Sequence, residues 1–364
     1  MLIRNARLHP YALPLRAEWK TAAGAFAIRE GWLMHIETED GRSGYGDCAP
    51  LPDPNAQSGT ETAAQAHAAL DGYARWLPGH SVAEALQTLA LPGDIALAPA
   101  ARCAIECALL DLAAQAAGVG LGHFLRGAPC APDVAVNAAL GGLAASSKDA
   151  VRKACADGFT VLKLKVGSAP VDAEIAHLQR LAELLPGGTE LRLDANRAWS
   201  ENDAARFLAA CAGLPVEQLE EPLADPQPAA LARLQAACAF PLALDESGPH
   251  DAADPFFAAP PLRRLVIKPP RLGGLRPALA LAHAAGAAGI DCVVTSSLDS
   301  ACGILAAAHL AAALGNDLAH GLATAGWLAE DTGLAPRVQA GRLKFPDEPG
   351  LGFSPYGRTI PTDD

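Results

Sequence analysis

The sequence has no C-x-x-C pair, although it contains nine cysteines in 364 residues. The absence of this spacing excludes a thioredoxin-type redox motif and the usual cysteine-rich zinc sites. An odd number of scattered cysteines in a large alanine-rich chain is typical of reduced thiols and not of a disulfide framework. We therefore expect the cysteines to act as small buried hydrophobic residues.

Positive charge is also scarce: 28 Lys and Arg stand against 40 Asp and Glu, which gives a net charge of −12 and a pI near 5.3. A phosphate-rich surface would repel such a chain, so nucleic acid and an anionic membrane are excluded as expected partners. We expect a small-molecule substrate instead, with self-association into a homo-oligomer left open.

No apolar run is long enough to cross a bilayer. The longest, near 278–290 and 304–314, are alanine-rich and contain histidines, so they predict packed helices. The start, MLIRNARLHPYALPL, lacks a charged segment followed by an apolar core and a cleavage site. These absences favour a cytoplasmic protein.

The residues present predict an α/β protein with more than one domain, because a chain that is 51% hydrophobic has ample material for a large core. Residues 1–100 alternate apolar and polar around an Asp40-Gly41 turn, which predicts an antiparallel sheet. Helical stretches are expected at about 60–90 and at Pro99–Ala117. A boundary is expected between Leu125 and Pro132.

Beyond that boundary, short strand-like runs alternate with helical stretches. The runs are AVNAAL, VLKLKV, ELRLDAN, VEQLEEP, PLALDES, LVIKPP and DCVVTSS. This rhythm is the signature of parallel βα units.

A polar residue lies at or near the end of each of the last six runs, at nearly constant spacing. The steps are 29, 26, 25, 23 and 28 residues, and the positions are Lys165, Asp194, Glu220, Asp245, Lys268 and Ser296. A closed barrel brings the carboxyl ends of its strands to one rim, where its active sites lie. An open doubly wound sheet gathers ligands at one switch point instead. We therefore predict a (β/α) TIM-like barrel.

Two lysines share one face of the VLKLKV strand, Lys163 and Lys165, because side chains alternate along a strand. Two ammonium groups about 6–7 Å apart disfavour each other's charge. One pKa should therefore fall toward neutrality, as a general base requires. A pair of solvated edge-strand lysines is the plainer alternative, but the flanking residues are all aliphatic.

Three carboxylates follow on successive strands: Asp194, Glu220 and Asp245. Converging carboxylates repel one another unless a cation neutralises them, and hard oxygen ligands select Mg²⁺, with Mn²⁺ as a substitute. Lys268 should lie across the barrel from Lys165. The reacting carbon would then sit between two lysines, with its carboxylate on the metal, which stabilises an enediolate.

Together these motifs resemble the muconate-lactonizing-enzyme branch of the enolase superfamily over nearly the whole chain. The resemblance implies that Lys165 is the base, Lys163 its pKa-lowering neighbour and Lys268 the opposing lysine. It implies metal ligation by Asp194, Glu220 and Asp245, with Asn196 and Glu246 in support. It also implies a capping domain with lid loops over 1–125, a barrel over 126–325 and a segment at 326–364 that returns to the capping domain.

Within this branch the chain is most similar to the o-succinylbenzoate synthase family. The similarity rests on LRLDANRAWS, GYGDCAPLPDPNAQSGTET and TSSLDSACG. It implies Mg²⁺-dependent dehydration of 2-succinyl-6-hydroxy-2,4-cyclohexadiene-1-carboxylate in menaquinone biosynthesis, which would make the chain a lyase. Substrate contacts are expected from Ser296, Ser297, Arg192, Asn196 and Gly321. The segment Trp19–Gly31 is the expected lid, with Trp19, Phe26 and Arg29 as candidates.

Three alternatives stay open. N-acyl amino acid racemisation or dipeptide epimerisation would use the same lysines on opposite faces, although HGLATAGWL lacks the Asp-x-Asp pair of dipeptide epimerases. Muconate cycloisomerisation is possible on the same scaffold. A catalytically silent barrel would be expected to lack one of the lysines or carboxylates, and all are present.

Overall fold

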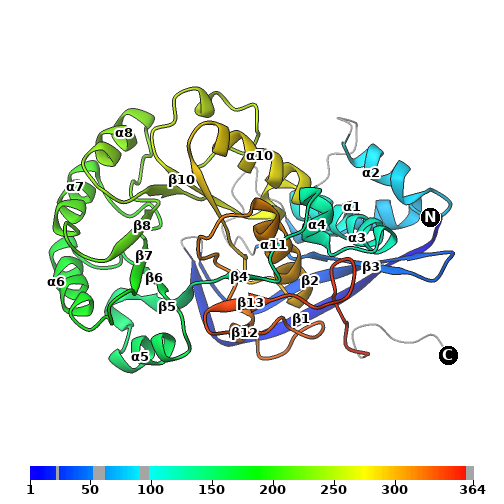
Figure 1. Ribbon diagram of the computed structural model, residues 1–364, viewed down its shortest axis with the longest axis horizontal. Helices are drawn as coiled ribbons and strands as arrows, with labels where there is room; N and C mark the ends of the chain where they lie inside the picture. The colour runs from blue at the N-terminus through cyan, green and yellow to red at the C-terminus, as the bar shows by residue number, and fades with distance from the viewer. Residues whose placement is uncertain (22–23, 52–61, 91–97, 358–364) are drawn as a thin grey trace.

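The computed structural model describes residues 1–21, 24–51, 62–90 and 98–357. Figure 1 shows an antiparallel sheet with its helices beside a curled parallel sheet ringed by helices. The α/β class and the barrel-type architecture predicted from the sequence are thus confirmed. Residues 52–61, which belong to the GYGDCAPLPDPNAQSGTET stretch, lie outside the described residues.

The N-terminal sheet has three antiparallel strands in the order β1 (Ile3–Thr21), β2 (Gly24–Thr38) and β3 (Ser43–Cys48). Four helices accompany it: α1 (Ala63–Trp76), α2 (Val82–Ala90), α3 (Pro99–Ala117) and α4 (Leu121–Arg126). Helix α3 is buried along most of its length and has the bounds expected from the sequence. It ends at Gly118, whose left-handed φ of 69° suits glycine.

Two glycines let β3 approach α3 closely. A Cβ on Gly44 would lie 2.2 Å from the carbonyl oxygen of Ala108, and one on Gly46 would lie 1.9 Å from that of Ala104. Any side chain here would push the strand off the helix. The contact fixes the N-terminal sheet against the helix that faces the barrel.

The parallel sheet contains seven strands in sequential order. They are β5 (Ala138–Gly142), β6 (Val161–Lys165), β7 (Glu190–Asp194), β8 (Val216–Glu220), β9 (Leu242–Leu244), β10 (Arg264–Ile267) and β11 (Asp291–Val294). The intervening helices are α5 (Lys148–Ala156), α6 (Val171–Ala182), α7 (Glu201–Ala210), α8 (Pro228–Ala236), α9 (Pro269–Leu272), α10 (Leu275–Ala287) and α11 (Ala301–Leu314). Short 3₁₀ turns, η1 (Leu143–Ala145), η2 (Pro255–Ala258) and η3 (Ala325–Trp327), complete the connections.

Two residues connect the segments next to the edge strands of this sheet, before β5 and after β11. His320 forms a parallel bridge with Val136, and Gly321 forms one with Thr295. The amide of His320 donates to Ala135 (2.8 Å), and that of Gly321 donates to Val294 (2.9 Å). The ring therefore closes through a two-residue segment in the place of a full eighth strand.

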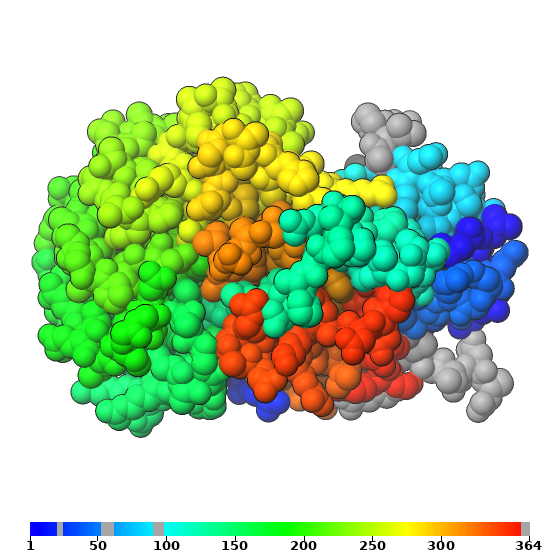
Figure 2. Space-filling view, viewed as in Figure 1, coloured from blue at the N-terminus to red at the C-terminus, as the bar shows by residue number. Residues whose placement is uncertain are grey.

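The C-terminal segment reaches both parts of the molecule. Strands β12 (Val338–Gln339) and β13 (Arg342–Lys344) form a small sheet with β4 (Asp133–Ala135). Further on, Gly350 exchanges hydrogen bonds with Val119 and Leu121 beside α3 and α4, and Figure 2 shows this red segment against the cyan helices. The division at 125 and 325 itself stays a prediction.

All nine cysteines are free, as the sequence predicted. In the part of the chain that the structure describes, none of the helices combines the length and apolar character needed to span a membrane.

Candidate active site

The polar strand ends lie in register. Lys165 on β6 pairs with Asp194 on β7, Asp194 pairs with Glu220 on β8, and Glu220 pairs with Ala243 on β9. Parallel strands in this register present their carboxyl ends at one rim. The constant spacing in the sequence therefore does place these residues at one level of the barrel.

Lys163 lies between two carboxylates. Its Nζ donates to Glu220 Oε2 at 2.8 Å and lies 3.1 Å from Asp194 Oδ2. Burial works against its charge, but Asp194 and Glu220 together raise the pKa of Lys163 above its ordinary value. Burial and the neighbouring Asp194 raise the pKa of Glu220 to about 8. Of the two lysines on β6, Lys163 is thus the one that stays protonated.

Lys165 behaves in the opposite way. Burial lowers its pKa, and the positive charges of Lys163 and Lys268 lower it further against the pull of Asp194. The ring of Trp19, from β1, lies over its ammonium group, 5.7 Å from nitrogen to ring centroid. Lys165 therefore has the direction of pKa shift that a general base needs.

Lys268, directly after β10, forms an ion pair with Asp245 and lies 3.9 Å from Glu246 Oε1. Burial opposes its charge, but these two carboxylates and Glu220 raise its pKa. Arg271 contacts the other oxygen of Asp245 at 3.1 Å. Sequence reasoning missed Arg271, although Lys268-Pro-Pro-Arg271 at the start of the short helix α9 places the arginine near the same carboxylate.

The chemistry of Asp194, Glu220 and Asp245 suits a magnesium ion, since they are buried hard-oxygen donors on three neighbouring strand ends. Burial is the main reason that the pKa of Glu220 is raised, and the negative charges of Asp194 and Asp245 raise it further. A bound cation would relieve the repulsion among the three carboxylates. Within the described residues, however, no three His, Cys, Asp or Glu side chains are arranged to hold a metal. Lys163 and Lys268 form ion pairs with the carboxylate oxygens that would ligate a metal ion.

Ser296 and Ser297 follow β11 on the same rim. The hydroxyl of Ser296 lies 2.6 Å from that of Thr324, whereas the buried hydroxyl of Ser297 has no hydrogen-bond partner among the described residues. Asn196 has a positive φ of 44°, and its backbone amide donates a hydrogen bond to Asp194 Oδ1 at 3.1 Å. Their contacts with substrate stay predictions.

Gly321 and Arg192 contribute to the structure of the barrel. A Cβ on Gly321 would lie 2.6 Å from Thr295 Cγ2, so glycine permits the closing bridge. Arg192 is buried inside the barrel, where it donates to Glu217 (3.0 Å) and to the carbonyl of Ala319 (2.7 Å). Its donors are used internally, and we therefore do not propose a substrate contact for Arg192.

The described parts of the predicted lid segment, 19–21 and 24–31, belong to β1 and β2, in which Trp19 pairs with Phe26; residues 22–23 lie outside the described residues. Arg29 is completely buried and donates to the carbonyls of Ala49, Pro50 (2.6 Å) and Leu298 (3.2 Å). Arg29 thus ties the hairpin to the loop after β11, and Trp19 is the lid candidate that reaches Lys165.

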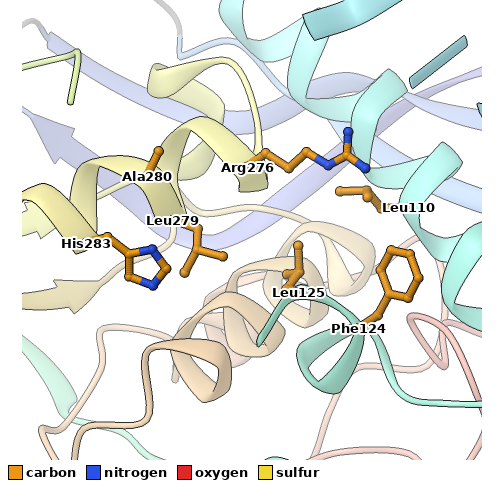
Figure 3. A pocket seen from close by; sticks show the side chains of 7 residues that line it. All are labelled: Leu110, Phe124, Leu125, Arg276, Leu279, Ala280 and His283. Atoms are coloured by element: carbon orange, nitrogen blue, oxygen red, sulfur yellow. The ribbon is translucent and has the colours of Figure 1, made fainter. Parts of the chain in front are cut away.

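A surface hollow of about 270 Å³ lies elsewhere, between α3, α4 and α10. Figure 3 shows its lining of Leu110, Phe124, Leu125, Leu279 and Ala280, with Arg276 and His283 at its edges. None of the residues at the polar strand ends lines it.

Two family models together match most of the chain. The family model described as "Enolase C-terminal domain-like" matches residues 146–358, and "MenC, N-terminal domain" matches residues 3–100. An L-Lys-D/L-Arg epimerase of Methylococcus capsulatus is 32% identical, over 97% of this chain and 99% of its own. An o-succinylbenzoate synthase of Pectobacterium atrosepticum is 29% identical, over 88% and 90%.

Two solved structures share the fold over nearly the whole chain. A dipeptide epimerase from Enterococcus faecalis, complexed with Mg and L-Leu-L-Tyr, superposes with a TM-score of 0.86 at 28% identity, over 97% of this chain and 100% of its own. Muconate lactonizing enzyme from Pseudomonas fluorescens, complexed with muconolactone, has a TM-score of 0.86 at 25% identity, over 99% and 98%. The family-model match, which covers more than half of the chain, and these relatives establish that the protein is an enzyme of the enolase superfamily, in its muconate-lactonizing-enzyme branch.

Proposed function

We propose that the enzyme is an o-succinylbenzoate synthase, which removes water from 2-succinyl-6-hydroxy-2,4-cyclohexadiene-1-carboxylate. The match of residues 3–100 to the MenC N-terminal model is the observation that supports this specific activity. Proton abstraction itself is supported by the contrast between two lysines at one rim: the pKa of Lys165 is lowered, and that of Lys268 is raised. One lysine is thereby suited to take a proton, and the other is suited to remain a cation.

Asp194, Glu220 and Asp245 would hold Mg²⁺. The related dipeptide epimerase from Enterococcus faecalis is itself complexed with Mg. When bound, the ion would draw charge from the substrate carboxylate and so make the adjacent proton more acidic. For the ion to bind, Lys163 and Lys268 would have to lose part of their ion pairing with these carboxylates.

Lys165 would remove the proton next to the carboxylate and become an ammonium group. The resulting enediolate then expels the ring hydroxyl, and the proton on Lys165 can leave with it as water, so that the ring becomes aromatic. Lys268, kept charged by Asp245, would lie against the developing ring as a cation–π partner.

Two observations support a substrate without a free amine. The segment Gly321–Trp327 contains no carboxylate, and its Thr324 hydroxyl lies against that of Ser296.

N-acyl amino acid racemisation is the second candidate. Its substrate also lacks a free amine, and the placement of lysines on β6 and after β10 suits proton transfer on two faces of one carbon. Dipeptide epimerases and muconate cycloisomerases are among the relatives, so these two reactions are further candidates.

The test is to incubate the purified enzyme with Mg²⁺ and the cyclohexadiene substrate while following the absorbance change on aromatisation. A Lys165→Ala variant and an EDTA-treated sample are the controls. Rapid turnover that both controls abolish would support the synthase, its base and its metal together.

If the cyclohexadiene does not turn over, the same enzyme should be placed in D₂O with N-succinyl amino acids and with dipeptides. Deuterium uptake at the α-carbon would move the proposal to a racemase or an epimerase. No exchange on any of these substrates would contradict proton abstraction itself.

A further inference from the structure

The carboxylate of Glu221 makes contacts that the reaction proposed above does not use. Glu221 follows the proposed metal ligand Glu220 and is completely buried. Its φ of 47° is in the left-handed region, which costs a non-glycine residue about 1–2 kcal/mol. A buried acid in such a conformation needs compensating contacts.

Those contacts all come from the end of β9. Glu221 Oε1 accepts hydrogen bonds from the backbone amides of Asp245 and Ser247, both at 2.8 Å. Glu221 Oε2 accepts one from the hydroxyl of Ser247, also at 2.8 Å. The carboxylate thus holds the backbone on which the Asp245 side chain is mounted.

The backbone of Glu221 connects the same region further. Its amide donates to the carbonyl of Ala243 at 2.9 Å, and its carbonyl accepts from the amide of Arg197 at 2.8 Å. A single residue therefore joins the ends of β7, β8 and β9, which carry the three proposed metal ligands.

We propose that Glu221 is a positioning residue that sets the place of Asp245 relative to Asp194 and Glu220, and so sets the affinity for the divalent cation. This inference rests on the proposed function, in which Asp245 is a metal ligand. The carboxylate of Glu221 is directed at the amide and hydroxyl donors of Asp245 and Ser247, and it would not ligate the ion.

The chain offers a matched control in Glu174. This glutamate is also buried, and it accepts hydrogen bonds from the backbone amides of Gly167 (2.8 Å), Ser168 (3.0 Å) and Ala169 (3.1 Å). It holds the loop after β6, which carries no proposed metal ligand. Glu174→Ala should lower thermal stability as Glu221→Ala does, but it should leave Mg²⁺ affinity unchanged.

The experiment is calorimetric titration of Mg²⁺ into metal-free wild-type enzyme and into the variants Glu221→Ala, Glu221→Gln, Glu174→Ala and Asp245→Asn. We expect Glu221→Ala to bind Mg²⁺ about 10–100-fold more weakly, as is usual for residues that orient ligands. Glu221→Gln should stay within about threefold of wild type, because its amide oxygen can still accept from both backbone amides.

Glu221→Asp keeps the charge but is shorter, so it supplies the same comparison if Glu221→Ala does not fold. A folded Glu221→Asp or Glu221→Ala variant with wild-type Mg²⁺ affinity would overturn the inference alone, provided that Asp245→Asn loses binding. Wild-type affinity in Asp245→Asn, or no Mg²⁺ binding by the wild type, would overturn the proposed metal site and this inference with it.

Discussion

Trp19 connects the N-terminal hairpin to the barrel chemistry through one side chain. Its ring lies over Lys165 and meets the ring of Trp327 edge-on, with 5.0 Å between ring centroids and an interplanar angle of 82°. Trp327 comes from the segment that follows the closing bridge. Two distant segments thus form an aromatic wall above the proposed base.

We expect Trp19→Ala to lower kcat/KM by about 3–10-fold, since contacts of this kind contribute about 0.5–1.5 kcal/mol. Trp32→Ala is the control, because Trp32 stacks on His67 in the N-terminal part, with 5.1 Å between ring centroids. Steady-state kinetics on the substrate that turns over in the assays proposed above would measure both. Equal rates for Trp19→Ala and wild type would exclude the wall from catalysis.

Arg29 illustrates a buried cation that stabilises loops. Replacing it with methionine leaves the buried carbonyls of Ala49 and Leu298 without their donor, which should lower the free energy of unfolding by about 2–4 kcal/mol. Arg16→Met is the matched control, because Arg16 also donates to a carbonyl, that of Gly326, but at the surface. Urea unfolding of both variants checks this, and similar losses would show that burial is not the cause.

Individual side chains were predicted unevenly from the sequence. Lys163, Lys165, Asp194 and Glu220 could be located because strand alternation and βα spacing fix where such residues point. Arg271 was missed, although its spacing from Lys268 was a signal, because its position depends on a four-residue helix. The contacts of Glu221 could not be predicted, since they depend on a left-handed backbone turn. Arg29 was expected to be a substrate-contacting residue of the lid. The residues next to it in the sequence do not reveal that its side chain is buried.

At the scale of elements, the contact of β3 with α3 depends on two glycines that leave no room for a Cβ. We expect Gly46→Ala to lower the free energy of unfolding by at least about 2 kcal/mol, because the strand must move off the helix. Thermal unfolding would measure the change. Gly72→Ala, in α1 where nothing lies within 4 Å of the added Cβ, should instead stabilise by about 0.5–1 kcal/mol. Comparable losses in both variants would contradict the packing argument.

The succession of strands and helices was accessible from the sequence because short strand-like runs alternate with helical stretches, as they do in parallel βα units. The closing bridge was not, since His320 and Gly321 are too few to show a period. Helix α3 was predicted with its observed bounds because Pro99 starts it and Gly118 ends it.

At the scale of the whole molecule, Asp111 joins three regions. Its carboxylate accepts from the amide of Tyr45 on β3 (3.1 Å), from Gln115 on α3 (2.8 Å) and from the amide of Leu351 in the C-terminal segment (2.8 Å). Burial is the largest influence and raises the pKa of Asp111 to about 6, from an ordinary value of 3.8.

The folded state therefore binds this proton more tightly than the unfolded state does. The stabilising contribution is complete below about pH 3.8 and is lost as the pH rises through about 6. Relative to an Asp111→Asn variant, the wild type should lose about 2.4 kcal/mol of unfolding free energy between pH 4 and 7. Urea unfolding at several pH values measures the difference, with Asp71→Asn on the exposed face of α1 as the control. A difference that does not change with pH would contradict the raised pKa.

The bridge through His320 and Gly321 also bears on how the chain is made. During synthesis from the N-terminus, β5 and β11 exist before the two residues that link them. A nascent chain that ends before His320 would have two unpaired sheet edges, which are templates for aggregation. The last step of ring closure thus falls to a segment near the C-terminus, and a ribosome-bound chain should need chaperone protection until that segment emerges.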